Sequence, residues 1–315
     1  MFKKFLKILR SVAVLVAIAV AVFWFTRPAD LNFDELRSSI PFSEYSHFAV
    51  VDGVSLHYQE KGTGPTLVLI HGYVSSTYSW KDVFEPLSQK YRVIAVDLKG
   101  FGFSEKPDGD YSRRAQAILV GHLLEQLKID KAWICGNSMG GETAINVALQ
   151  FPERVAGLVL IDAAGIVVPG AATLVPAYLK IPVINRLLSA FALTSDKLVR
   201  EGLEKSFYDD SKITPERVAY YHRPLKTLGG QLAALRARAD FGNYPVEPEL
   251  GKIGVPTLLI WGAHDELIPL EAGRKMNSLI KNSKLVVIEE CGHVPQEEMP
   301  KRIVAEIIGT MPSSD

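Results

Sequence analysis

Short runs of β-branched and other apolar residues recur along the chain from Phe48 onward and alternate with segments in which apolar residues have a helical spacing. These runs predict eight strands, at residues 47–51, 54–60, 66–70, 92–97, 132–136, 157–162, 257–261 and 284–289. The last six are nearly continuously apolar, as is typical of strands buried on both faces. Helices are predicted at 115–127 and after Ser138. The alternation predicts an α/β fold with a mostly parallel, eight-stranded sheet flanked by helices.

One long insertion interrupts the alternation after the strand that ends in "VLID". Residues 166–195 are apolar and proline-containing, whereas 196–240 are charged and have a helical pattern. We interpret 166–245 as an inserted helical cap over the carboxyl ends of the strands, where parallel sheets bind ligands. An extension of the core is the alternative. With a cap, the core domain comprises 47–165 and 246–312.

The first 27 residues differ from the rest of the chain, since an uncharged run at 11–26 follows the cationic residues Lys3, Lys4, Lys7 and Arg10. As a helix this run spans about 24 Å, less than the ~30 Å hydrocarbon core of a membrane. Flanking apolar residues extend the span if the lysines among them snorkel. We therefore predict that residues 1–27 form a signal anchor, which is a single transmembrane helix. A cleaved signal peptide is the alternative, which bulky Phe23, Trp24 and Phe25 disfavour.

The charge before this run predicts where the domain lies. An excess of cations ahead of the span places the N-terminus in the cytoplasm and the domain on the far, periplasmic side of the membrane. Residues 28–46, interrupted by Pro28 and Pro41, are interpreted as a tether between the anchor and the domain.

Overall charge and cysteine content narrow the classes of function. Lys+Arg 35 balances Asp+Glu 35, so no net field attracts nucleic acid. Cys135 and Cys291 are too few for a disulfide framework and lack metal-ligand spacing, which predicts two unbonded, packed cysteines. The glycine-rich segment 97–107 lacks the order of a dinucleotide site, so it is interpreted as a structural turn. We expect no cofactor and no metal; the oligomeric state stays open.

The stretch "GNSMGG" places Ser138 between a buried strand and a helix, the context of a nucleophile elbow. Gly136 and Gly140 suit such a turn because strand and helix approach each other closely there. The helix N-terminus supplies free N–H groups and the positive end of the helix dipole, both of which stabilise an oxyanion. By itself the motif is also compatible with an ordinary glycine-containing turn.

Two later strand ends supply the partners of Ser138. Asp265 follows the strand "TLLIW" and His293 follows the final strand, in the chain order of acid and then histidine. The carboxyl ends of parallel strands meet at one edge of the sheet. We therefore predict that Ser138, Asp265 and His293 form a catalytic triad. His293 would move the proton of Ser138, and Asp265 would orient the imidazole. Asp162, which ends another strand, is the alternative acid.

An oxyanion hole is predicted beside the elbow. The loop "HGYVSS" follows the strand "TLVLI", where the fold supplies a second donor. We assign the backbone N–H groups of Tyr73 and Met139 to the oxyanion hole. His71 is expected to brace the loop.

With these motifs the sequence resembles the α/β-hydrolase fold family, from about Phe48 to Ile308. "HGY", "DLKGFGFS", "GNSMGG", "GAHDELIP" and "GHVPQEE" match the family's oxyanion loop, post-strand turn, elbow, acid loop and histidine loop. Haloalkane dehalogenases and epoxide hydrolases carry aspartate at the elbow, so Ser138 argues against both. "GNSMGG" is similar to the elbow of meta-cleavage-product C–C hydrolases, although "HGYVSSTYSW" replaces their glycine- and proline-rich oxyanion loop.

The N-terminal segment followed by this domain is similar to membrane-bound monoacylglycerol lipases. That resemblance implies hydrolysis of monoacylglycerols or related lipid esters, with the domain usually facing the cytosol, opposite to the orientation that the charges predict. Our leading hypothesis is a membrane-anchored serine hydrolase that cleaves a small, lipid-like carboxylic ester through an acyl-enzyme. The alternatives are a C–C hydrolase, a binding protein without catalysis, and an aminopeptidase whose amine-binding acids would be Glu201, Glu204, Asp209 and Asp210.

Overall fold

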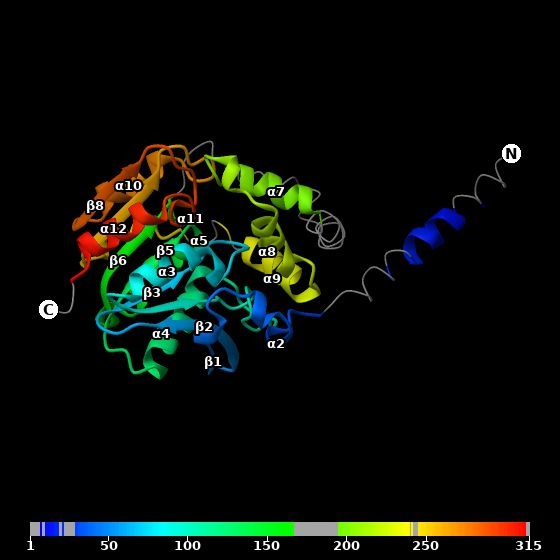
Figure 1. The fold of residues 1–315 in the computed structure, drawn as a ribbon, viewed down its shortest axis with the longest axis horizontal. Helices are drawn as coiled ribbons and strands as arrows, with labels where there is room; N and C mark the ends of the chain where they lie inside the picture. The colour runs from blue at the N-terminus through cyan, green and yellow to red at the C-terminus, as the bar shows by residue number, and fades with distance from the viewer. Residues whose placement is uncertain are drawn as a thin grey trace.

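The structure is a computed structural model that describes residues 7, 10–18, 21, 29–166, 195–239, 241 and 245–312. Among these residues one eight-stranded sheet has the order β1-β2-β4-β3-β5-β6-β7-β8 (Figure 1). The strands are β1 Ser46–Val51, β2 Val54–Lys61, β3 Thr66–Ile70, β4 Arg92–Val96, β5 Ala132–Asn137, β6 Val155–Ile161, β7 Thr257–Gly262 and β8 Ser283–Ile288. β1 and β2 pair antiparallel and the ladder from β4 through β8 is parallel, which confirms the predicted mostly parallel sheet.

Helices cover both faces of the sheet because successive strand residues point to opposite sides. In β3, Val68 and Ile70 belong to the core under α4 (Arg113–Gln126) and α5 (Met139–Gln150), whereas Leu67 and Leu69 belong to the core under α3 (Lys81–Ser88) and α12 (Pro300–Thr310). The helices of the described residues are α2 Phe33–Leu36, α3 Lys81–Ser88, α4 Arg113–Gln126, α5 Met139–Gln150, α7 Asp196–Glu204, α8 Pro215–Leu225, α9 Leu228–Ala239, α10 Leu270–Leu279, α11 Pro295–Glu298 and α12 Pro300–Thr310. Cys135 and Cys291 are buried and unbonded within these cores, as predicted.

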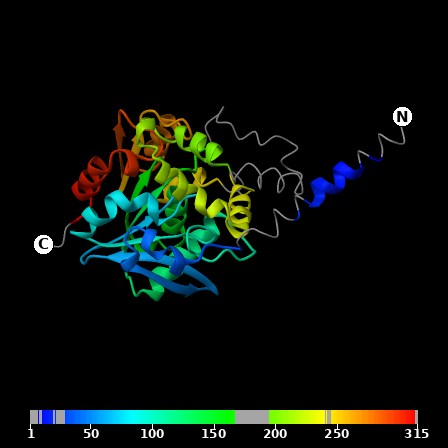
Figure 2. The ribbon, with the colours of Figure 1, turned by 45° about the vertical axis from the view of Figure 1, so that its right-hand side comes forward.

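The described part of the region interpreted as a cap is mainly helical. Helices α7, α8 and α9 lie together at one end of the sheet (Figures 1 and 2). They contact loops that follow the carboxyl ends of strands: the Tyr73 hydroxyl donates to the Ala234 carbonyl at 2.9 Å, and the His293 N–H donates to the Ser206 carbonyl at 2.7 Å. Residues 167–194 of the predicted cap lie outside the described residues, so its boundaries stay a prediction.

The N-terminal region contains a helical, exposed segment at 10–18. Within the described ranges, no helix is long and apolar enough to cross a membrane. The span predicted at 1–27 falls largely outside those ranges.

Residues 29–45 of the predicted tether are folded onto the domain. Phe33 of α2 packs edge-on against Phe48, with ring centroids 5.2 Å apart, and against Phe103, at 5.3 Å. The Lys106 ammonium donates to the Asp30 carboxylate at 3.0 Å. Phe33 thus gives this segment apolar surface to bury against the domain.

Candidate active site

Ser138 occupies a strained turn between β5 and α5. Its φ of 55° and ψ of −120° place a non-glycine residue in a sparsely populated backbone region. Four hydrogen bonds hold it there: its N–H donates to the Ile161 carbonyl at 3.0 Å, and its carbonyl accepts from the N–H groups of Gly141, Glu142 and Ala164. The strain is therefore sustained by the surrounding backbone, as is typical of a nucleophile elbow.

Glycines permit the close contacts around this turn. A Cβ on Gly136 would lie 2.2 Å from the Gly140 carbonyl oxygen, and a Cβ on Gly140 would lie 2.1 Å from the Ile70 carbonyl oxygen. Both contacts are to backbone atoms, which cannot rotate away as a side chain could. The two glycines are therefore required for α5 to start directly against β3 and β5.

We expect Gly140→Ala to destabilise the protein by about 2 kcal/mol or more, because the new methyl group overlaps the Ile70 carbonyl. Gly309→Ala in α12 is the matched control: its Cβ would meet no atom within 4 Å, and alanine favours a helix by up to about 1 kcal/mol. Urea unfolding of both variants measures the difference. Equal stability of the two variants would contradict the steric argument.

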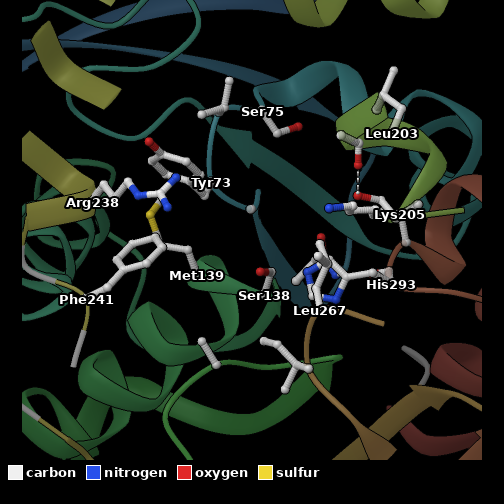
Figure 3. Close-up of a pocket in the computed structure, with 18 of the residues that line it drawn as sticks. Tyr73, Ser75, Ser138, Met139, Leu203, Lys205, Arg238, Phe241, Leu267 and His293 are labelled. Carbon is white, nitrogen blue, oxygen red and sulfur yellow. Dashed lines mark hydrogen bonds between the residues drawn. The ribbon is translucent and has the colours of Figure 1, made fainter. Parts of the chain in front are cut away.

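The structure brings Asp265 and His293 together at the same edge of the sheet. The Nδ1 atom of His293 lies 2.7 Å from Oδ2 of Asp265, and the Asp265 side chain is fully buried. The other oxygen of Asp265 accepts the N–H groups of Leu267, at 2.8 Å, and Ile268, at 2.9 Å. The Ser138 hydroxyl and the His293 ring point into one cavity (Figure 3). Ser138 and His293 of the predicted triad therefore line one cavity, and Asp265 lies against the His293 ring.

Tyr73 and Met139 line the same cavity on the other side of Ser138 (Figure 3). In the described part of the chain, neither backbone N–H has a hydrogen-bond partner. Two unpaired donors beside a nucleophile are what an oxyanion hole requires.

His71 braces the loop that carries Tyr73. Its Nδ1 lies 2.7 Å from the Gly72 carbonyl oxygen, and its Nε2 accepts the Leu98 N–H at 3.1 Å. This pattern requires a neutral ring, and burial lowers the pKa of His71 accordingly. The glycine-rich segment 97–107, which was interpreted as a structural turn, is held by a hydrogen bond that the Asp97 carboxylate accepts from the Phe103 N–H.

Two polar side chains that the sequence did not reveal as site residues hold the His293 loop. The Asn137 amide donates to the His293 carbonyl at 3.0 Å, from the position directly before Ser138. Glu298 is buried, and its Oε1 accepts the Gly292 N–H at 2.7 Å. The position of Asn137 at the end of a predicted strand, directly before Ser138, could have indicated a site residue. Nothing in the sequence indicates that Glu298 binds the Gly292 N–H.

A buried charge cluster joins the cap to the core beside this loop. Arg217 of α8 lies 3.1 Å from Glu297 of α11, measured from Nε to Oε2, and the Tyr221 hydroxyl donates to the other oxygen of Glu297. Tyr221 also lines the cavity. Burial raises the pKa of Glu297 to about 7, although Arg217 acts in the opposite direction.

Glu297 should make stability depend on pH. Its pKa rises from 4.5 to about 7 on folding, so the folded state binds the proton more tightly. This tighter proton binding contributes on the order of 3 kcal/mol to the free energy of unfolding. The contribution is complete below pH 4.5 and is lost as the pH rises through 7. Glu297→Gln should therefore show a smaller fall in Tm between pH 5 and pH 8 than the unmodified protein, as measured by thermal unfolding. The exposed Glu290→Gln is the control, and an equal fall in all three proteins would contradict the assignment.

The cavity has a volume of about 620 Å³ and a mostly apolar lining. Apolar side chains come from the core loops and from the cap: Val74, Met139, Ile166, Leu198, Val199, Leu203, Leu225, Phe241, Leu267, Ile268 and Val294. Among the described residues, the cations that line it are Lys205 and Arg238, both exposed. Figure 3 shows them on opposite sides of Ser138.

The acids considered for amine binding do not line this cavity; they are Glu201, Glu204, Asp209 and Asp210. Glu204 instead pairs with Arg200 at 3.0 Å. Asp209 accepts the Ser211 N–H at 3.0 Å, as a cap of the following turn.

Comparison with known proteins agrees with this geometry. The family model described as alpha/beta hydrolase fold matches residues 65–300. The chain therefore belongs to the α/β-hydrolase fold family, and its relatives support a hydrolase activity.

Three relatives illustrate the range of that family. An uncharacterized hydrolase of Bacillus subtilis, YugF, is 35% identical over 82% of this chain and 94% of its own length. The 2-hydroxy-6-oxo-6-phenylhexa-2,4-dienoate hydrolase of Comamonas testosteroni is 32% identical over 77% of this chain and 86% of its own length. The crystal structure of a membrane phospholipase A, described as a bacterial virulence factor, superimposes with a TM-score of 0.75 at 28% identity, covering 96% of this chain and 97% of the other.

Proposed function

We propose that the chain is a serine hydrolase in which Ser138 is the nucleophile. The observation that carries this proposal is the strained Ser138 facing the cavity that His293 also lines, with the ring nitrogen Nδ1 of His293 bound to buried Asp265. His293 takes the proton of the Ser138 hydroxyl as the oxygen attacks a carbonyl carbon, and it later delivers this proton to the leaving group. Asp265 fixes the tautomer and stabilises the imidazolium.

The backbone N–H groups of Tyr73 and Met139 form the oxyanion hole in this proposal. They lie beside Ser138 in the cavity lining and have no competing partner in the described part of the chain. Donors held by the fold cost no reorganisation when the negative charge develops. Water then hydrolyses the acyl-enzyme, with His293 as the base.

The bond cleaved is proposed to be a carboxylic ester with an apolar acyl group. The mainly apolar lining suits an acyl chain, and a structural relative is a membrane phospholipase A. The relative from Comamonas testosteroni supports the alternative, cleavage of a C–C bond in an anionic ring-cleavage product. A cation buried beside Ser138 would suit such an anion best, whereas the two cations of the described lining, Lys205 and Arg238, are exposed.

A membrane location through residues 1–27 and a periplasmic domain remain part of the proposal. The support is the uncharged run at 11–26 after a cationic start, together with the alignment of nearly the whole chain with a membrane phospholipase A. Fractionation of cells that express the full chain tests the membrane location. Recovery of a chain lacking residues 1–27 from the soluble fraction, with the full chain in the membrane fraction, is the expected result.

We expect Ser138→Ala to lose hydrolysis of p-nitrophenyl and monoacylglycerol esters by about 10³-fold or more, because no nucleophile remains. Labelling with a fluorophosphonate should disappear in the same variant. Ser278→Ala, a serine on α10 remote from the cavity lining, is the control and should keep both properties. Ester turnover that survives in Ser138→Ala would overturn the nucleophile, whereas turnover of 2-hydroxy-6-oxo-dienoates without any ester turnover would favour the C–C alternative.

A further inference from the structure

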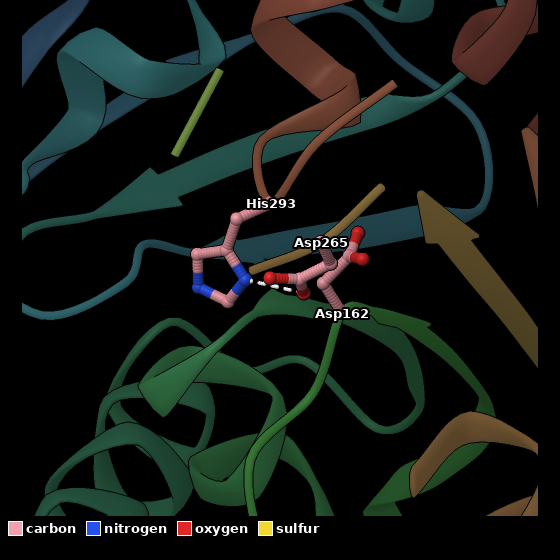
Figure 4. A group of neighbouring side chains, drawn as sticks. All are labelled: Asp162, Asp265 and His293. Atoms are coloured by element: carbon pink, nitrogen blue, oxygen red, sulfur yellow. Dashed lines mark hydrogen bonds and ion pairs between the residues drawn. The ribbon is translucent and has the colours of Figure 1, made fainter. Parts of the chain in front are cut away.

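Asp162 lies beside the pair formed by Asp265 and His293, although it comes from a different strand end. One oxygen of each aspartate and one ring nitrogen of His293 lie within 4.8 Å of one another, and all three residues are buried (Figure 4). Asp162 directly follows β6 and Asp265 follows β7, which are neighbouring parallel strands. The site thus contains two carboxyl groups next to one imidazole.

The two carboxyl groups have unequal hydrogen-bond environments. Asp265 accepts from His293 on Oδ2 and from two backbone N–H groups on Oδ1. Asp162 accepts only the Gly262 N–H on Oδ1, at 2.9 Å, and its Oδ2 has no partner among the described residues. A carboxylate is stabilised by the N–H groups that it accepts, so the negative charge belongs on Asp265.

The backbone holds Asp162 in this place at a conformational cost. Its φ is 43°, in the left-handed region that glycine prefers, and its N–H donates to the Ile260 carbonyl at 2.9 Å. Its side chain is fully excluded from solvent. A buried carboxylate that accepts a single N–H group is costly, so a proton on the acid lowers the cost of its burial.

Burial and two neighbouring acids act on the pKa of Asp162 in the same direction, whereas the hydrogen bond from the Gly262 N–H acts in the opposite direction. Burial raises the pKa of Asp162 well above its usual range, and the charges of Asp265 and Glu298 raise it further. The Cys291 thiol also lies near Asp162 and is itself kept protonated, because burial raises its pKa. Two buried carboxylates this close cannot both be ionised at neutral pH.

We infer that Asp162 carries a proton at neutral pH and is a positioning residue that keeps a single negative charge, on Asp265, beside His293. The inference rests on the proposed function for its catalytic meaning. A second negative charge would stabilise the imidazolium, so that less of the neutral imidazole would be available as a base. The proton on Asp162 leaves Asp265 alone to orient the ring.

Infrared difference spectroscopy tests the protonation directly. The spectrum of the unmodified protein minus that of Asp162→Asn at pH 7 should contain the carbonyl-stretch band of a protonated carboxylic acid. The band should persist when both proteins also carry Ser138→Ala. This measurement needs no turnover, so a failure of the proposed function would leave it intact. Absence of the band at pH 7 would overturn the inference.

The pH dependence of kcat/KM tests whether Asp162 places a negative charge beside His293. If Asp162 is neutral, Asp162→Asn leaves the midpoint of the acidic limb within about 0.3 unit, because no charge next to His293 is removed. A midpoint lowered by about one unit or more would show that Asp162 was ionised and would overturn the inference.

A second variant keeps the test decisive if Asp162→Asn does not fold. Asp265→Asn removes the neighbouring charge, so the carboxylic-acid band should titrate with a midpoint lower by about one unit or more than in the unmodified protein. An unchanged midpoint would contradict the coupling between the two acids.

Discussion

The parallel register of β5, β6, β7 and β8 is the constraint on which the site depends. Asn137 pairs with Ile161, and Ile161 pairs with Ile260, two residues before the end of β7, so these strands end close together at one edge of the sheet. Each chain segment that leaves this edge carries one reactive group, although the groups are far apart in sequence. A shift of one residue in any ladder would also turn every side chain of that strand to the other face. Burial of both faces of the sheet therefore fixes the position of the site as well as the core.

The edge combines backbone strain with dense hydrogen bonding, and each depends on the other. Ser138 and Asp162 both have positive φ values and both belong to the tight turns that follow strands. Backbone bonds hold Ser138 in this conformation, and the absence of side chains at Gly136 and Gly140 makes room for them. The strained turn directs the Ser138 hydroxyl outward into the cavity, as the proposed role of Ser138 as a nucleophile requires.

The sequence was sufficient to predict the sheet, the elbow and the strand ends at Asp265 and His293, because apolar runs and glycine spacing are local signals. It did not reveal that Asn137 and Glu298 hold the His293 loop, since a hydrogen bond to a distant backbone group leaves no periodic pattern. For a similar reason the sequence did not reveal that the predicted tether folds onto the domain. Phe33 packs against Phe48 and Phe103, which lie next to each other only in the folded chain. The sequence identified Asp162 as an acid at a strand end, but only the structure shows that its Oδ2 has no hydrogen-bond partner among the described residues.

The cap is coupled to the chemistry through the same loop that carries the histidine. The Ser206 carbonyl, which follows α7, accepts the His293 N–H, and Glu298 accepts the Tyr208 N–H from the next turn of the cap. A rearrangement of α7 that admits a substrate would therefore strain the bonds that orient His293. The core residues alone are compatible with cleavage of either an ester or a C–C bond, because both begin with attack on a carbonyl. The helices of the predicted cap supply much of the cavity wall and also contact the loop that carries His293. They therefore link the choice of substrate to the alignment of His293, the proposed base.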